Sequence, residues 1–185
     1  MIRQAVIEDA EQVMPLVHDA IGSIANSLAG TDDEAEAMRI LSEFYREPGN
    51  RLSYGHVIVE ERNGQVAGIL IAYDGSRADE LDKPFLDRIR TETGRTDYMI
   101  EKEPQPGEYY LDSIAVRESY RGQGIAKGLM AAFEAKAKEE GHKKLSLIVE
   151  QENDRAYALY RKMGYEEDGT LQVSGHLFRR MVKEI

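Results

Sequence analysis

The stretch Val116-Arg-Glu-Ser-Tyr-Arg-Gly-Gln-Gly-Ile-Ala-Lys-Gly128 decides the fold of this 185-residue chain. It follows a β-rich run, contains two closely spaced glycines and leads into an amphipathic helical run. A glycine turn between a strand and a helix aims several free backbone N–H groups at one point, at the positive end of the helix dipole. Three basic residues against one acidic residue give the stretch a charge of +2. The stretch therefore predicts a seat for a phosphate group.

Two other phosphate motifs do not fit this turn. The dinucleotide-binding fingerprint Gly-x-Gly-x-x-Gly would need a third glycine at position 127 after Gly122 and Gly124, and this chain has Lys127 there. The P-loop consensus does not occur in the chain. For the glycines taken alone, an ordinary tight turn without a ligand is the alternative interpretation.

The residues after position 108 predict alternating strands and helices. In chain order they are a strand at 109–116, a helix at 124–140, a strand at 144–149, a helix from an Asn153 cap to Gly164, and a hairpin of 165–173 with 176–182. A strand, a helix and a second strand in succession imply one parallel crossover. The fold class expected is therefore mixed α/β.

The residues before position 108 add helices, a hairpin and a long connection. The pattern predicts a strand at 2–7, a helix over 10–28 capped by Asp9, a helix begun by a Thr31–Glu34 capping box, and strands at 56–61 and 65–73 joined across Asn63-Gly64. The connection 74–107 has a thin helical pattern near 78–91, interrupted at Lys83-Pro84. A connection of this length is either a lid over a substrate or a plain surface insertion.

Composition excludes several classes of function. The formal charge of −10 argues against partners with a phosphate backbone, so no nucleic acid is expected, and no anionic membrane surface. The chain has no Cys, and its four His show no metal-ligand spacing, so no metal is expected. No apolar run approaches a membrane span, and the first ten residues lack a signal-peptide core. We expect a soluble, cytoplasmic protein.

Two blocks of the chain resemble one family, the GNAT superfamily of acetyl-CoA-dependent N-acetyltransferases. The first is Ile114-Ala115-Val116 followed by Arg121-x-x-Gly124-x-Ala126, and the second is Asn153-x-x-Ala156-x-x-Leu159-Tyr160-x-Lys162-x-Gly164-Tyr165. They stand in the family's order and together cover about 109–166. The resemblance implies a single domain over 1–185, with a mostly antiparallel central sheet, one parallel strand pair and flanking helices. Residues 1–107 would form the acceptor-side half and 108–185 the acetyl-CoA-binding half.

The resemblance also implies roles for particular residues. The backbone of Ile114, Ala115 and Val116 would pair with the pantetheine arm, and Asn153 and Tyr160 would lie near the arm and the sulfur. The pyrophosphate would be bound by the turn and helix start, which consist of Arg121, Gly122, Gln123, Gly124, Ile125, Ala126 and Lys127. Tyr160 resembles the general acid that protonates the departing thiolate; the alternative is a buried aromatic on a helix face.

The base that would deprotonate the acceptor amine is less clearly marked. Asp112 is a carboxylate within an apolar strand, so it is either a base, a substrate anchor or a paired structural group. Strand alternation predicts that it shares a face with Tyr110, Ile114 and Val116. Glu108 at the strand start is the second candidate. Ile148 occupies the position at which ribosomal-protein acetyltransferases of this superfamily carry a glutamate, which argues against that substrate class.

Charge is unevenly divided along the chain. Residues 1–107 hold 11 basic and 21 acidic side chains, and residues 108–185 hold 13 of each. The acidic half favours a cationic small-molecule or peptide amine as the acceptor, unless its helices are merely well solvated. A CoA-binding module without turnover is the alternative function, and transfer of a longer acyl group or to a hydroxyl is another. The sequence leaves monomer and homodimer open.

Overall fold

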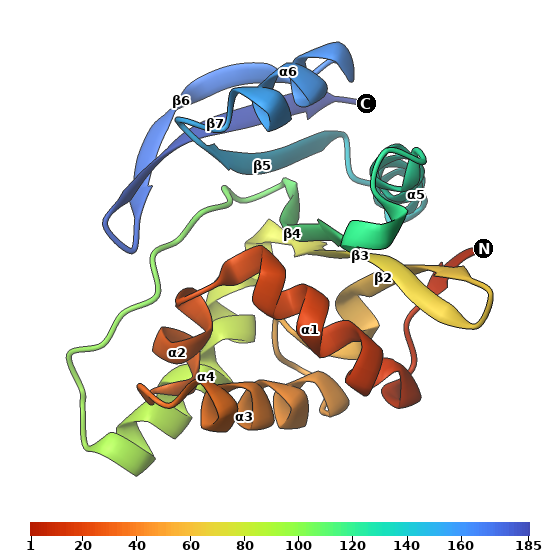
Figure 1. Ribbon diagram of the computed structural model, residues 1–185. Helices are drawn as coiled ribbons and strands as arrows, with labels where there is room; N and C mark the ends of the chain where they lie inside the picture. Colours follow the sequence, from red (N-terminus) through yellow and green to blue (C-terminus); the bar gives the residue numbers. More distant parts are fainter.

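The computed structural model describes residues 1–185, which form one seven-stranded sheet with helices on both faces (Figure 1). The strand order is β1-β2-β3-β4-β5-β7-β6, and only β4 and β5 are parallel neighbours. The strands are β1 (Ile2–Gln4), β2 (Val57–Arg62), β3 (Gln65–Asp74), β4 (Tyr109–Val116), β5 (Lys144–Glu150), β6 (Glu166–Val173) and β7 (His176–Glu184). The expected fold class, mixed α/β with one parallel strand pair, is confirmed.

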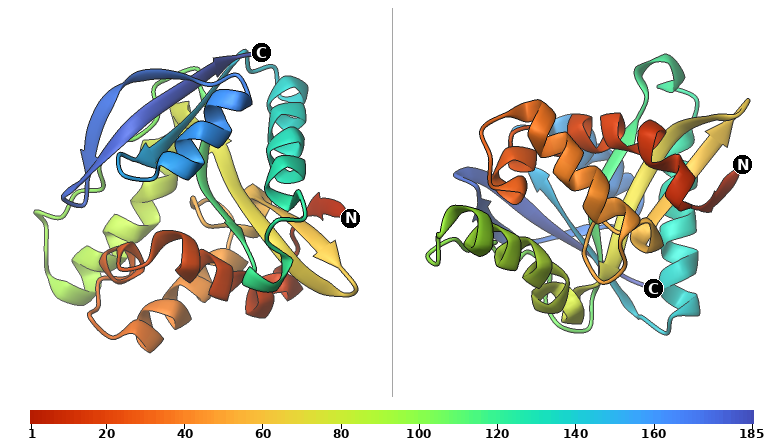
Figure 2. Two further views of the ribbon diagram at one scale, coloured as in Figure 1. Left: turned by 45° about the horizontal axis from the view of Figure 1, so that its top comes forward. Right: turned by 90° about the horizontal axis from the view of Figure 1, so that it is seen from below.

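Two groups of helices cover the two faces of the sheet. The helices are α1 (Ala10–Ile21), α2 (Ile24–Ala29), α3 (Glu34–Arg46), α4 (Ala78–Thr93), α5 (Ile125–Glu139) and α6 (Asp154–Lys162). Helices α1 to α4 bury one apolar cluster against β2 and β3, whereas α5 and α6 bury a second against the opposite face. Figure 2 shows α5 and α6 as two separate helices on this face. None of these helices is both long and apolar enough to cross a membrane.

Strands β4 and β5 part after three residue pairs. Their parallel ladder runs from Tyr109 opposite Leu145 to Leu111 opposite Leu147 and then stops. Beyond that point β4 stays paired with β3 as far as Val116, and β5 stays paired with β7 as far as Glu150. The sheet therefore has a gap in its middle, bordered by the second half of β4.

Strand β4 carries a bulge that corrects one sequence prediction. Leu111 lies opposite Ala72 and Ser113 opposite Ile71, so Asp112 between them has no partner on β3. An extra residue reverses the alternation of the residues that follow it. Ile114 and Val116 consequently join Tyr109 and Leu111 on the α5 face, while Tyr110 packs against α4. The prediction that Tyr110, Asp112, Ile114 and Val116 share one face was wrong.

Two predictions for the first helices were also wrong. The run 10–28 is divided into α1 and α2 at Gly22, whose φ of 51° and ψ of −128° no helix can continue. Helix α3 is capped by Asp33, which accepts a hydrogen bond from the Glu36 N–H at 2.7 Å, and not by Thr31. Thr31 instead accepts from the Asp33 N–H at 3.3 Å. The second error arises because Thr31, Asp32 and Asp33 are adjacent residues that can each cap the same helix start.

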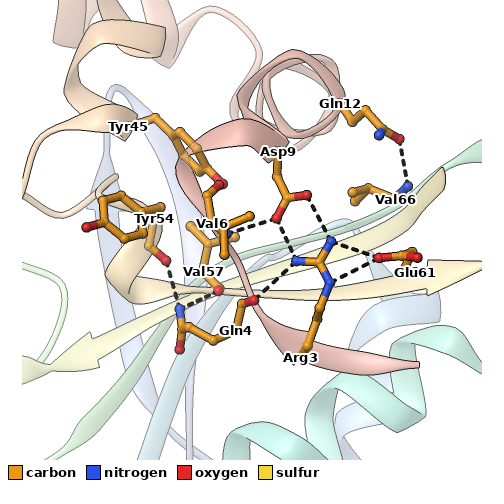
Figure 3. Close-up of polar contacts among 10 residues, drawn as sticks. All are labelled: Arg3, Gln4, Val6, Asp9, Gln12, Tyr45, Tyr54, Val57, Glu61 and Val66. Atoms are coloured by element: carbon orange, nitrogen blue, oxygen red, sulfur yellow. Dashed lines mark hydrogen bonds and ion pairs between the residues drawn. The ribbon is translucent and has the colours of Figure 1, made fainter. Parts of the chain in front are cut away.

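Asp9 does not cap α1 with its side chain; it is one partner of a polar cluster at the sheet edge (Figure 3). Arg3 on β1 donates to both Asp9 carboxylate oxygens, at 2.7 and 2.9 Å, and also to Glu61 of β2. Asp9 further accepts from the Val6 N–H. A bidentate guanidinium satisfies this carboxylate better than a cap would, and it ties the short strand β1 to the helical layer.

The long connection 74–107 is more regular than its sequence suggests. Helix α4 runs from Ala78 to Thr93 without ending at Pro84, because Leu81, Phe85 and Ile89 are all buried on its inner side. Side chains attach the segment after α4 to the sheet. Tyr110 of β4 donates a hydrogen bond to Glu103, and Arg180 of β7 donates one to Glu108. Packing of one apolar stripe has outweighed the unfavourable proline.

Candidate functional site

A groove of about 1080 Å³ lies where the gap in the sheet meets helices α5 and α6. Nine of the residues expected to bind a cofactor line it: Ile114, Val116, Arg121, Gly122, Gly124, Ile125, Ala126, Lys127 and Asn153. Ala115 turns to the opposite face, Gln123 in the turn is exposed, and Tyr160 of α6 is buried and is not among the lining residues. The fold thus brings together blocks that are separated by a helix and a strand in the chain.

The start of α5 has the geometry of an anion seat. Gly122 and Gly124 both have left-handed φ angles, 78° and 82°, and a Cβ built on either would meet no atom within 4 Å. Gly124 precedes Ile125, the first residue of this 15-residue helix. The first N–H groups of a helix have no partner within it, so they are free to bind an anion here.

The groove also gathers cations that have no anionic partner. Arg121, Lys127, Arg155 and Lys162 all line it, and none of them forms an ion pair, although 15 of the 24 Lys and Arg residues of the chain do. In a chain with a net charge of −10, four free cations around one groove create a local positive field. The residues present therefore fit a ligand that carries several phosphates.

The backbone of β4 faces the gap at two residues. The Arg117 N–H donates to the Ala67 carbonyl at 2.9 Å, which makes these two a hydrogen-bonded pair of the β3–β4 ladder. Because such pairs alternate along an antiparallel ladder, Ala115 also bonds toward β3, and Ile114 and Val116 direct their N–H and C=O groups away from it. A linear amide-containing ligand can therefore pair with β4 as an added strand.

Helix α6 supplies the two polar side chains expected beside the reacting atoms. The Asn153 side-chain oxygen accepts from the Ala156 N–H at 3.1 Å and so caps the helix. Tyr160 is 8% exposed. Its hydroxyl has no hydrogen-bond partner in the protein, yet Ser146 Oγ is the one fully buried side-chain atom without a partner, so the Tyr160 hydroxyl keeps some access to solvent. Burial raises the pKa of Tyr160 to about 12, so the hydroxyl keeps its proton at neutral pH.

Asp112 lies at the bulge within a buried ionic cluster. Arg51, from the segment between α3 and β2, donates Nε to Asp112 Oδ2 at 2.9 Å and also donates Nη2 to it. Asp82 of α4 and Glu103 approach the same guanidinium at 3.3 and 3.8 Å. Burial raises the pKa of Glu103 to about 7, although Arg51 opposes that rise. The cluster thus holds three carboxylates and one guanidinium.

Glu108, the other candidate base, is engaged on both carboxylate oxygens. Arg180 of β7 donates Nη1 to Oε2 at 2.9 Å and Nη2 to Oε1, and the Gln105 N–H donates to Oε2. Burial by itself raises the pKa of Glu108, but these hydrogen bonds outweigh burial and hold the pKa below its usual value. Both carboxylate oxygens of Glu108 therefore already accept hydrogen bonds from the protein.

Comparison with known proteins identifies the family. Residues 22–165 match the family model described as the acetyltransferase (GNAT) family. The chain belongs to this family. A crystal structure described as an acetyltransferase superposes with a TM-score of 0.83 and 33% sequence identity, over 100% of this chain and 99% of that one. A second, an N-acetyltransferase from Staphylococcus aureus Mu50, has a TM-score of 0.77 and 25% identity over 98% and 99% of the two chains.

Curated GNAT relatives match over shorter stretches. An acetyltransferase of Yersinia pestis (strain Pestoides F) is 35% identical over 69 residues, which are 37% of this chain and 47% of that protein. The chloroplastic GCN5-related N-acetyltransferase 4 of Arabidopsis thaliana is 35% identical over 89 residues, 46% of this chain and 31% of that protein. This chain therefore matches about half or less of the length of these curated relatives.

Sequence reasoning missed several residues of the candidate site and of the ionic cluster beside the β4 bulge. Arg51 lies in a loop 61 positions before its partner Asp112, and Glu103 lies in a stretch without secondary structure. Neither has a local pattern that marks it. Arg155 and Lys162 could have been found, because both lie on α6 within three residues of an expected site residue. The acidic residues three or four positions away, Glu152 and Glu166, lie outside the helix and cannot pair along its surface.

Proposed function

We propose that this GNAT protein transfers an acetyl group from acetyl-CoA to a primary amine of a small molecule or peptide. The observation that carries the proposal is the juxtaposition of a glycine loop and four unpaired cations with the open backbone edge of β4 in one groove. The loop and cations suit the phosphates of CoA, and the β4 edge suits its amide-containing arm. The thioester then lies near the point where β4 and β5 part.

The reaction is a direct transfer. The neutral amine nitrogen attacks the thioester carbonyl carbon, and the carbon–sulfur bond breaks as the amide bond forms. A backbone N–H at the β4 edge stabilises the oxyanion that develops on the carbonyl. Tyr160 gives its hydroxyl proton to the departing thiolate and regains a proton afterwards. The acceptor loses one proton to solvent, so the products are the acetylated amine and CoA.

The acceptor side supports a cationic substrate. Residues 1–107, which form α1 to α4 and the strands β1 to β3, carry the entire net charge of −10. An acidic surface concentrates amines that are protonated in solution and raises their rate of encounter. High salt should therefore raise the KM for a cationic acceptor more than the KM for a neutral one.

Thiol release tests the proposal. Acetyl-CoA is incubated with the protein and a panel of polyamines, amino acids, aminoglycosides and peptides, and free thiol is followed by a colorimetric reagent. Release above background with at least one acceptor, together with a product mass increased by one acetyl group, is the expected result. The alternative, a module that binds CoA without turnover, would show calorimetric CoA binding and no thiol release with any acceptor.

A further inference from the structure

The bulge on β4 lies at the point where β4 leaves β5. Asp112 is the residue without a β3 partner, and the β4–β5 ladder ends one residue earlier, at Leu111. Ile114, the first residue whose backbone faces the gap beyond the parting, is two positions further on. Asp112 therefore directly precedes the part of β4 that borders the gap and would hold the thioester.

The Asp112 carboxylate is saturated by donors from three elements. Arg51 donates twice to Oδ2, Tyr73 of β3 donates its hydroxyl to Oδ2 at 3.1 Å, and Ser113 donates its hydroxyl to Oδ1 at 2.9 Å. The side chain is 6% exposed. Four hydrogen bonds from the protein therefore already engage this carboxylate.

Arg51 is itself fixed to the acceptor-side layer. Its backbone N–H donates to the Leu81 carbonyl of α4 at 3.3 Å, and its side chain is 8% exposed. Its guanidinium is the one cation that the structure places among the Asp82, Glu103 and Asp112 carboxylates. Loss of that cation leaves three buried carboxylates facing one another, which strongly disfavours the arrangement.

We propose that Arg51 and Asp112 are positioning residues that hold the β4 bulge and so set the width of the gap in which the thioester reacts. A bulge sacrifices ladder hydrogen bonds and persists where its surroundings determine it. Asp112 has no residue opposite it on β3, and its ion pair with Arg51 supplies the contact that holds it instead. The inference rests on the proposed function for its catalytic consequence, but the anchoring itself is a property of the strand.

The choice of acceptor separates positioning from base catalysis. A base is needed for an amine of pKa about 10 and is dispensable for one of pKa about 7, which is largely neutral at pH 8. Loss of a base therefore lowers kcat less with the weakly basic amine than with the strongly basic one. Loss of a positioning residue lowers kcat by the same factor with both amines, because the thioester is misplaced in either case.

The experiment compares Asp112→Asn, Arg51→Met, Arg51→Lys and the double variant Asp112→Asn/Arg51→Met. Expected are decreases in kcat of about 10- to 100-fold in the single variants, equal for the two amines, with the Kd for CoA within about threefold of wild type. The double variant should be no worse than the more affected single variant, because the two residues act as a unit. Arg51→Lys should restore part of the rate, since lysine keeps the charge but not the bidentate geometry.

Arg3→Met is the matched control. It removes another guanidinium–carboxylate pair, the partly buried pair with Asp9, from a strand at the far edge of the sheet (Figure 3). It should lower the melting temperature and leave kcat unchanged. Unchanged kcat in both Asp112→Asn and Arg51→Lys would overturn the proposal. A defect in Asp112→Asn that shrinks by tenfold or more with the weakly basic amine would overturn it in favour of a base.

A second readout does not depend on turnover. Hydrogen exchange at the peptide level should be faster in 111–116 for Asp112→Asn and Arg51→Lys than for wild type, and unchanged at the start of α5. Exchange equal to wild type in 111–116 would overturn the anchoring role. A wild-type protein that releases no thiol with any acceptor would instead defeat the proposed function, and the exchange measurement would still decide the anchoring.

Discussion

The ring of Tyr160 packs edge-on against the ring of Tyr165, with centroids 6.0 Å apart and planes at 64°. This ring contact holds the Tyr160 side chain through its apolar surface and leaves the hydroxyl without a hydrogen-bond partner in the protein. A hydroxyl that is held in place and keeps its proton is suited to donate to a ligand.

Tyr160→Phe should lower kcat by about 100- to 10,000-fold and leave the Kd for CoA nearly unchanged. The ring and its packing remain, and only the proton donor is lost. Thiol-release kinetics and calorimetry measure the two quantities. Tyr165→Phe is the control, because it keeps the same ring pair and should retain the rate. A wild-type rate in Tyr160→Phe would remove the general-acid role.

Gly124→Val should raise the Kd for CoA at least tenfold, measured by calorimetry. Its φ of 82° strains any branched side chain by about 1–2 kcal/mol, and the new side chain would occupy open space in the groove. Gly175→Val at the β6–β7 turn has a similar φ of 79° and equally open surroundings, so it matches the strain without touching the groove. Equal CoA affinities in the two variants would place the phosphate seat elsewhere.

Arg155→Gln and Lys162→Gln should each weaken CoA binding by about three- to tenfold at low salt. Both cations line the groove and neither has an anionic partner to release, so their charge is available to a phosphate. The loss should shrink in 0.5 M salt as screening increases. Lys143→Gln removes another unpaired cation, outside the groove, and should leave the affinity unchanged. An effect of Lys143→Gln as large as the others would mean that net charge alone is responsible.

Glu108→Gln should lower the free energy of unfolding at pH 7 by about 3 kcal/mol, because it leaves Arg180 without its buried partner. The pKa of Glu108 is depressed in the folded state, so the stabilisation is present above the unfolded pKa of about 4.3 and is lost as pH falls through the lower folded value. Urea denaturation at several pH values should therefore show the two proteins converging in acid. A fall of more than about tenfold in thiol release per folded molecule would instead restore Glu108 as the base.

Local signals determined most of the fold. Asn63 and Gly64 have φ angles of 51° and 75°, and the hairpin that their dipeptide predicts is present between β2 and β3. The strand 109–116, the glycine turn, the following helix and the Asn153 cap are confirmed within one or two residues. Each depends on residues close together in the chain, so short-range periodicity and capping suffice to predict it.

Tertiary structure alone decided the break between α1 and α2, the continuity of α4 through Pro84 and the environment of Asp112. One inserted residue reversed the faces of Ile114 and Val116, and Arg51, 61 positions away, holds that insertion in place. The sequence predicted which residues would carry phosphate-binding and acid chemistry. Where they meet was decided by the parting of β4 and β5, because strand register and buried ion pairing depend on contacts between residues far apart in the chain.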